Sequence, residues 1–116
     1  MTTSFILYGI KNCQTVKKAR TWLEQHDKPY HFHDVRSDGL TAEQLADFVA
    51  RSDWQTLLNR SSTSWRAIPP EQQADLDQDK AMALILAKPT LMKRPVLDTG
   101  TQLLVGFSPE RYEKAL

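Results

Sequence analysis

The sequence predicts one α/β domain in which a four-stranded mixed sheet carries packed helices and is interrupted by a helical insertion. Two observations predict this class: residues 4–35 read as strand, helix, strand, and residues 95–115 read as strand, strand, helix. The third observation is the middle, approximately residues 38–88, where helical patterns occur without a clear strand. We therefore expect the sheet and its helices to come from approximately residues 1–37 and 89–116 of a single domain.

The N-terminal part predicts two parallel strands joined by a helix. Residues 4–8 form a short apolar run that ends at Gly9, a pattern typical of a buried strand. Asn12 is placed to cap the next helix, which Lys28-Pro29 ends. Residues 30–35 read as the second strand, and the helical crossover makes the two strands parallel. The apolar face of the helix consists of Val16, Ala19 and Leu23.

The insertion is predicted to begin with a capped helix. Thr41 and Gln44 have the spacing of a capping box, and Leu40 and Leu45 have that of a hydrophobic staple. A polar loop at residues 59–64 follows this helix. The apolar face of the helix continues through Phe48 and Val49.

Two further helices are predicted before the chain returns to the sheet. Pro69-Pro70-Glu71 can open a short helix, because proline is well suited to a first helical position. A last helical stretch ends before Pro89. Its side chains at helical spacing are Ala81, Leu84, Ile85 and Lys88.

The C-terminal part predicts a β-hairpin followed by a helix. Residues 95–97 and 102–105 flank Asp98-Thr-Gly-Thr101, a composition typical of a hairpin turn. Ser108 and Pro109 then supply a cap and a first helical residue. The predicted helix runs through Tyr112 and Ala115.

Composition is that of an ordinary globular protein and excludes several classes. The chain has 116 residues, 41% hydrophobic and 25% charged, enough for one core. Fifteen basic and 14 acidic side chains leave a formal charge of +1, so we expect neither direct nucleic-acid binding nor a membrane partner. The single cysteine, Cys13, excludes an internal disulfide and predicts a reducing, cytoplasmic location.

Cys13 is the candidate nucleophile. It is predicted to lie just after the cap of the first helix, where free N–H groups and the helix dipole stabilise a thiolate. Lys11 and Lys17 add positive charge nearby. The alternative is a buried cysteine that packs as a small hydrophobic side chain. Helix-start position favours the reactive interpretation.

A second thiol would have to come from outside the chain. The third residue after Cys13 is Val16, so the sequence has no Cys-x-x-Cys pair. A lone thiolate can attack a disulfide but cannot resolve the product internally. Glutathione is the abundant cytoplasmic candidate for this co-substrate.

Arg94-Pro95 is the candidate anion-binding element. The two donors of the Arg94 guanidinium could hold a substrate carboxylate near the thiolate. The alternative is a solvated arginine beside Lys93, at the point where a strand begins.

Two other features have competing interpretations. The segment Asn59-Arg-Ser-Ser-Thr-Ser-Trp-Arg66 could bind an anion or a partner protein, or could be a connection whose hydroxyls satisfy turn amides. His31 and His33 share one strand face, but the sequence offers no second ligand pair, so a solvated face is favoured and no metal is expected.

Five motifs together resemble the arsenate reductase (ArsC)/Spx family, and within it the YffB-like group. The combination is specific and covers essentially the whole chain. It consists of Tyr8-Gly-Ile-Lys-Asn-Cys13, Lys17-Lys-Ala-Arg-Thr-Trp-Leu23, Leu58-Asn-Arg60, Lys93-Arg-Pro-Val-Leu97 and Leu104-Val-Gly-Phe107. The resemblance implies a thioredoxin-like, glutaredoxin-type fold with a helical insertion. It also implies that Pro95 is a cis-proline facing the turn of residues 9–13, which we call the cysteine turn.

The resemblance also implies roles for particular residues. In glutaredoxin-linked arsenate reductases three arginines surround the nucleophilic cysteine, and Cys13 and Arg94 match the cysteine and one arginine. The middle arginine falls at Asn59 or Arg60. The third is replaced within Val105-Gly-Phe107, and Val16 replaces a hydroxyl residue. Efficient arsenate reduction is therefore not expected.

The function expected from these residues is glutathione-dependent thiol–disulfide reduction by Cys13. Arg94 and Arg60 are candidate glutathione contacts, together with Lys11, Asn12 and Pro95. The expected partners are glutathione and a disulfide-containing or glutathionylated protein. The alternative is an Spx-like regulatory protein that binds RNA polymerase, without the Cys-x-x-Cys switch of that group.

Overall fold

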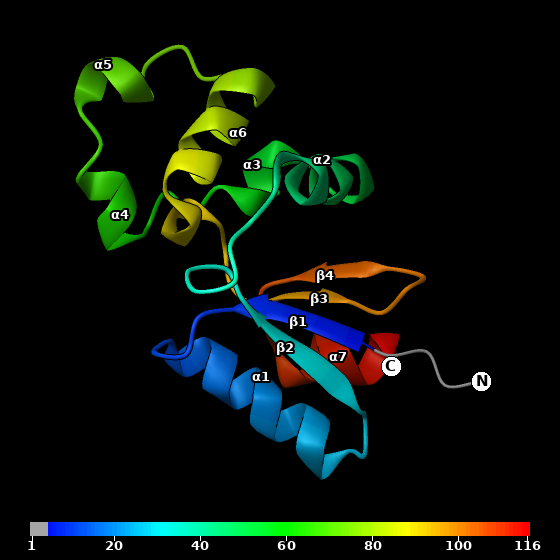
Figure 1. Ribbon diagram of the computed structural model, residues 1–116. Coiled ribbons are helices and arrows are strands. Elements are labelled where there is room, and N and C mark those ends of the chain that lie inside the picture. The colour runs from blue at the N-terminus through cyan, green and yellow to red at the C-terminus, as the bar shows by residue number, and fades with distance from the viewer. Residues whose placement is uncertain (1–4) are drawn as a thin grey trace. The chain divides into compact units, whose positions relative to one another are not determined.

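The computed structural model describes residues 5–116 and divides them into two compact units (Figure 1). One unit contains the described residues up to Asp38 together with Arg94–Leu116, and the other is Gly39–Lys93. Residue 4, the first residue of the predicted N-terminal strand, lies outside the described residues. That the whole chain forms a single domain stays a prediction.

The first unit contains the predicted four-stranded mixed sheet, which is confirmed. Its strands are β1 (Phe5–Gly9), β2 (Tyr30–Asp34), β3 (Val96–Asp98) and β4 (Leu103–Val105). They follow the order β2-β1-β3-β4. The β1 and β2 strands are parallel, whereas β3 is antiparallel to both β1 and β4.

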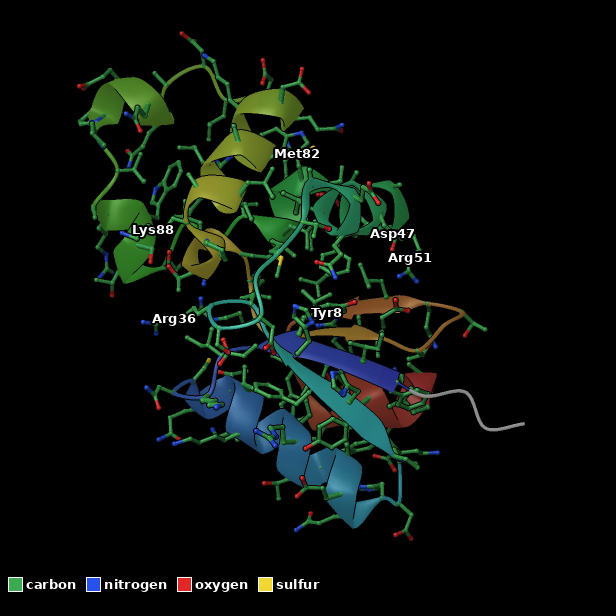
Figure 2. The ribbon with its side chains drawn as sticks, in the orientation of Figure 1. Tyr8, Arg36, Asp47, Arg51, Met82 and Lys88 are labelled. Atoms are coloured by element: carbon green, nitrogen blue, oxygen red, sulfur yellow. The ribbon has the colours of Figure 1, made fainter. Side chains whose placement is uncertain are left out.

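Helices α1 (Gln14–Gln25) and α7 (Pro109–Ala115) cover one face of this sheet (Figure 1). The alternation of β1 sends Leu7 toward these helices, whereas Tyr8 rises from the opposite face (Figure 2). Tyr8 packs there against His33, with ring centroids 4.9 Å apart. The fully buried residues between sheet and helices are Leu7, Val16, Ala19, Leu23, Leu97 and Tyr112.

The predicted cap of α1 is wrong by one residue. Cys13, and not Asn12, is the N-cap, because its backbone is extended while its carbonyl already accepts the Lys17 amide at 3.0 Å. The helix also ends earlier than Lys28. It stops at Gln25, since Asp27 has a positive φ of 54° and cannot continue the helix.

The end of β1 lies unusually close to α1. A Cβ atom at Gly9 would lie 2.7 Å from Val16 Cγ2, closer than real Cβ contacts. The glycine therefore allows the strand to approach the first turn of the helix. This contact fixes where Cys13, three residues before Val16, lies relative to the sheet.

The predicted C-terminal hairpin and helix are confirmed, with small shifts at their ends. Asp98 belongs to β3, and its side chain accepts the Gly100 amide at 2.9 Å. Gly100 has a φ of 93°, which suits a tight turn. Ser108 caps α7 by accepting the Arg111 amide at 3.1 Å. The Arg94-Pro95 peptide bond is cis, as expected.

The second unit is helical, and its first helix begins as predicted. The capping box of Thr41 and Gln44 is present at the start of α2 (Ala42–Arg51). In Figure 2 the side chains of Asp47 and Arg51 lie beside one another on this helix, and they form an ion pair of 2.9 Å. The later helices are α3 (Trp54–Leu57), α4 (Thr63–Arg66), α5 (Pro70–Gln73) and α6 (Gln78–Ala87).

The predicted polar loop at residues 59–64 is only partly a loop. Its last two residues begin α4, because the Ser62 hydroxyl accepts the Trp65 amide at 3.1 Å. A 3-10 helix, η1 (Pro89–Leu91), follows α6.

The two ends of the segment between α3 and η1 meet. Leu58 and Met92 form an isolated antiparallel bridge. The Asn59 amide donates to the Leu91 carbonyl at 2.8 Å, and the Lys93 amide donates to the Leu57 carbonyl at 2.7 Å. These hydrogen bonds join residues 57–59 to residues 91–93, so the chain between them forms a closed loop.

Candidate active site

Cys13 lies at the carboxyl end of β1 and at the start of α1. Its side chain is half-buried and packs against the core of the first unit. Among the described residues its sulfur makes no capping hydrogen bond. The amides of the first helical turn follow directly and have no intrahelical acceptors, so they present partial positive charge beside the thiol.

Basic side chains add to this charge. The first turn of α1 reads Gln14-Thr-Val-Lys17, without an acidic side chain. Lys11, Lys17 and Lys18 are all exposed. The dipole of α1 and the positive charges of these lysines would therefore both attract a thiolate or another anion at the start of the helix.

Asp34 anchors the turn that precedes Cys13. Its carboxylate accepts backbone amides of Lys11 at 3.2 Å, Arg36 at 2.8 Å and Ser37 at 3.2 Å. Burial raises the pKa of this carboxyl, but the three amide donors outweigh burial and the pKa is lowered overall. The ionised Asp34 thus ties β2 to the cysteine turn.

A small cleft of about 230 Å³ lies beside this anchored turn. It contains two of the predicted site residues, Lys11 and Asn12, together with Asp34 and Arg36. Figure 2 labels Arg36 on the loop that follows β2. The sequence analysis missed Asp34 and Arg36, although the carboxyl ends of adjacent parallel strands meet at one sheet edge and could have indicated them.

Arg94 and Pro95 lie at the same end of the sheet as the cysteine turn. Val96, which follows them, pairs with Tyr8 of β1 on one side and with Val105 of β4 on the other. The Gly106 amide donates to the Pro95 carbonyl at 2.8 Å. Arg94 is half-buried rather than fully solvated. Its role as a glutathione contact stays a prediction.

Arg111 is a further basic residue at this end, and the sequence analysis missed it. Its Nη1 donates to the Val105 carbonyl at 2.9 Å. A Cβ atom at Gly106 would lie 3.6 Å from the same nitrogen. The Arg111 side chain therefore holds the segment that, by family resemblance, lacks an arginine of its own.

Asn59 and Arg60 belong to the second unit, where their environments differ. The Asn59 side chain accepts the Ser61 amide at 3.1 Å, and its carbonyl accepts the Ser62 hydroxyl at 2.8 Å. Asn59 therefore builds the turn itself. Arg60 is exposed on that turn, which leaves it as the residue available for an anion. Two hydroxyls of this segment have structural partners: the Ser62 hydroxyl accepts the Trp65 amide, and the Ser64 hydroxyl hydrogen-bonds to that of Thr90 at 2.6 Å.

The histidines of β2 lie in different surroundings. His31 is exposed, and His33 packs against Tyr8. Within residues 5–116 no group of three or more His, Cys, Asp or Glu side chains is placed to hold a metal ion. No helix in the same residues is long and apolar enough to cross a membrane.

Comparison with known proteins decides the family. The ArsC family model matches residues 8–115, nearly the whole chain. The chain belongs to the ArsC family. Its four-stranded mixed sheet with packed helices is that of the thioredoxin-like ArsC structures.

Three relatives of this ArsC-family chain illustrate its range. The solved YFFB (PA3664) protein is 50% identical, with a TM-score of 0.93 and coverage of 97% of this chain and 99% of that one. An uncharacterized protein of Haemophilus influenzae is 38% identical over 109 residues, covering 94% and 96%. The global transcriptional regulator Spx of Listeria innocua is 26% identical over 115 residues, covering 95% and 85%.

Proposed function

We propose that this ArsC-family protein is a glutathione-dependent thiol–disulfide reductase with Cys13 as its nucleophile. The observation that carries the proposal is the N-cap position of Cys13, directly before first-turn amides that have no intrahelical acceptors. A half-buried thiol at such a position is accessible to a disulfide and still held by the core.

The proposed reaction has two exchange steps. The Cys13 thiolate attacks the glutathione sulfur of a glutathionylated protein, and the protein cysteine leaves as a thiolate that takes a proton from water. A second glutathione thiolate then attacks the Cys13–glutathione disulfide. Glutathione disulfide leaves and Cys13 is restored, so two glutathione sulfurs end oxidised and the substrate thiol ends reduced. This chemistry suits the reducing cytoplasm.

Polar and charged groups of the first unit are proposed to hold glutathione. Its carboxylates would contact Arg94, with Lys11 and Asn12 contributing from the cysteine turn. The backbone around Pro95 would lie along the tripeptide. Arg60 lies in the second unit, and its contact with glutathione stays a prediction from the family resemblance.

Direct reaction with glutathione disulfide tests the proposal. We expect the reduced protein to gain one glutathione, measured by intact mass, and added reduced glutathione to release it. Cys13→Ser is the control and should gain none. Backbone amide shifts during a titration with reduced glutathione should change at residues 10–17 and at Arg94. If the folded wild type showed no adduct and no shifts, the assignment would be overturned.

RNA polymerase binding is the second candidate, and the Spx relative favours it. Under this function Cys13 could be replaced without loss. A titration with the C-terminal domain of the polymerase α-subunit distinguishes the candidates, since amide shifts that persist in the Cys13→Ser variant would support a binding protein.

A further inference from the structure

A groove runs along α1 away from Cys13. It has a volume of about 450 Å³ and lies between the exposed side of α1 and the chain around Phe107 and Pro109. Gln14, the residue directly after Cys13, lines one part of it, and Gln25 at the other end of α1 lines another. The groove therefore begins beside the proposed nucleophile and follows the helix.

The apolar part of the groove has a fixed shape. Trp22 and Phe107 line it, and both rings form T-shaped contacts with the Tyr112 ring, at centroid distances of 5.4 Å and 4.7 Å respectively. Tyr112 is fully buried in the core. Because this shared ring cannot move without disturbing the core, the two aromatic side chains form a preformed surface.

The polar part of the groove is positively charged. Lys17 and Lys18 line it and are exposed, and the groove's other described lining side chains are uncharged. A positively charged border beside two aromatic rings complements a segment that combines carboxylates with apolar contact. Opposite charge would also raise the rate at which such a segment docks.

We propose that this groove receives an acidic, extended segment that flanks the reactive cysteine of the protein substrate. The proposal rests on the proposed function, because it names the class of protein on which Cys13 acts. Glutathione itself would contact Arg94 and Pro95, neither of which lines this groove.

Helix geometry predicts the position of the acidic residues. Lys17 and Lys18 follow Cys13 by four and five residues, which corresponds to about 6–8 Å along the helix axis at 1.5 Å per residue. An extended peptide rises about 3.3 Å per residue. The acidic residues should therefore lie about two positions from the cysteine that reacts.

Glutathionylated peptides of matched length test the proposal. Each contains one glutathionylated cysteine, with two aspartates, two alanines or two lysines at the second and third positions from it. The set is made with these residues before the cysteine and again after it. We expect the wild type to deglutathionylate the aspartate peptide of one set about threefold to tenfold faster than the lysine peptide. The difference should shrink in 1 M salt.

Charge reversal in the groove is the decisive variant. Lys17→Glu combined with Lys18→Glu should reverse the preference between the aspartate and lysine peptides. The ratio of the two rates is the readout, because a general change in Cys13 reactivity affects both peptides equally. Lys28→Glu is the matched control, because Lys28 lies in a different cleft, formed with Tyr30 and Phe32. In this variant the ratio of the rates with the aspartate and lysine peptides should equal that of the wild type.

Failure of this inference can be distinguished from failure of the proposed function. Equal rates for all peptides in both sets, with normal turnover, would overturn the groove assignment and leave the reductase assignment intact. Turnover absent for every peptide would overturn the reductase assignment. Binding is then followed separately in Cys13→Ser, where unmodified aspartate peptide should shift the Trp22 indole resonance. A stronger shift with a short oligouridylate would overturn the peptide assignment in favour of RNA.

Discussion

A thiol at an N-cap position differs from a thiol inside a helix. The Cys13 backbone is extended, with φ −108° and ψ 123°, while the amides that follow it are already helical. The residue therefore lies at the positive end of the helix dipole without belonging to the helix. Replacing Cys13 should change chemistry far more than stability, because its sulfur makes no capping bond within the described chain.

Arg94 offers the sharpest residue-scale prediction. Arg94→Lys keeps the charge but loses the planar pair of donors, whereas Arg94→Ala loses both. We expect glutathione affinity to fall in the order wild type, lysine, alanine. The alanine variant should lose about 1.5–3 kcal/mol of binding free energy, measured by calorimetry.

The two Arg94 variants must first be shown to fold, by circular dichroism and thermal melting. Equal glutathione affinity in all three folded proteins would show that Arg94 is only a structural residue at the start of β3. Polymerase-domain binding that depended on Arg94 would instead favour the Spx-like function.

Asp34 predicts a specific pH dependence of stability. Because its pKa is lowered in the folded protein, the ionised carboxylate contributes stability above the unfolded value of about 3.9, and this contribution is lost as pH falls through the folded value. Asp34→Asn should lower the free energy of unfolding by about 1–3 kcal/mol at pH 7. The difference in free energy of unfolding between the variant and the wild type should become smaller below about pH 4.

Urea unfolding at pH 7, 5 and 3 measures both proteins. If the difference in free energy of unfolding between the two proteins stayed constant with pH, the Asp34 charge would not anchor the cysteine turn.

At the scale of secondary-structure elements, β1 and α1 form one packed unit around Gly9 and Val16. Gly9→Ala places a methyl group 2.7 Å from Val16 Cγ2, so it should lower the free energy of unfolding by about 1–3 kcal/mol. Val16→Ala removes the clashing atoms. The double variant should therefore lose less stability than the sum of the two single losses.

Thermal and urea unfolding of the four proteins, wild type included, give this coupling. Strict additivity would mean that the strand and helix separate to accommodate the added methyl group.

Elements with local signals were predictable, and those fixed by distant contacts were not. The Thr41 capping box and the Ser108 cap depend on residues three apart, and both were found in the sequence. The cysteine turn depends instead on Asp34, which is 23 residues from Lys11. Arg111 was missed although its acceptor, the Val105 carbonyl, is only six residues away, because the two residues lie in different elements.

The start of α1 shows why a correct signal can give a wrong boundary. Asn12 is a good capping residue, but it lies in an exposed turn one residue before the helix cap. The close approach of Gly9 to Val16 sets where the helix begins, and Cys13 is left at the cap. Packing therefore overrides capping preference here, and it does so at the proposed nucleophile.

At the scale of the whole molecule, the family resemblance predicts a changed anion site on the family fold. The segment Val105-Gly-Phe107 has no arginine, and Phe107 packs against Tyr112 instead. We therefore expect arsenate turnover well below about 1 per second, even with glutathione and glutaredoxin supplied. Each lost charged contact to a doubly charged oxyanion removes about 1.5–3 kcal/mol.

Coupled consumption of NADPH through glutathione reductase measures this turnover. A rate of about 1 per second or faster would show that Arg111 or another cation supplies what residues 105–107 lack.

The bridge between Leu58 and Met92 has an evolutionary consequence. It closes the chain between these two residues into a self-contained excursion whose ends are fixed by hydrogen bonds at Asn59 and Lys93. Turns and short helices within the excursion can lengthen or shorten without displacing Lys93, which directly precedes Arg94. Descendants of this chain could therefore change the size and surface of residues 60–90, and so their partners, while keeping the cysteine turn and its cis-proline unchanged.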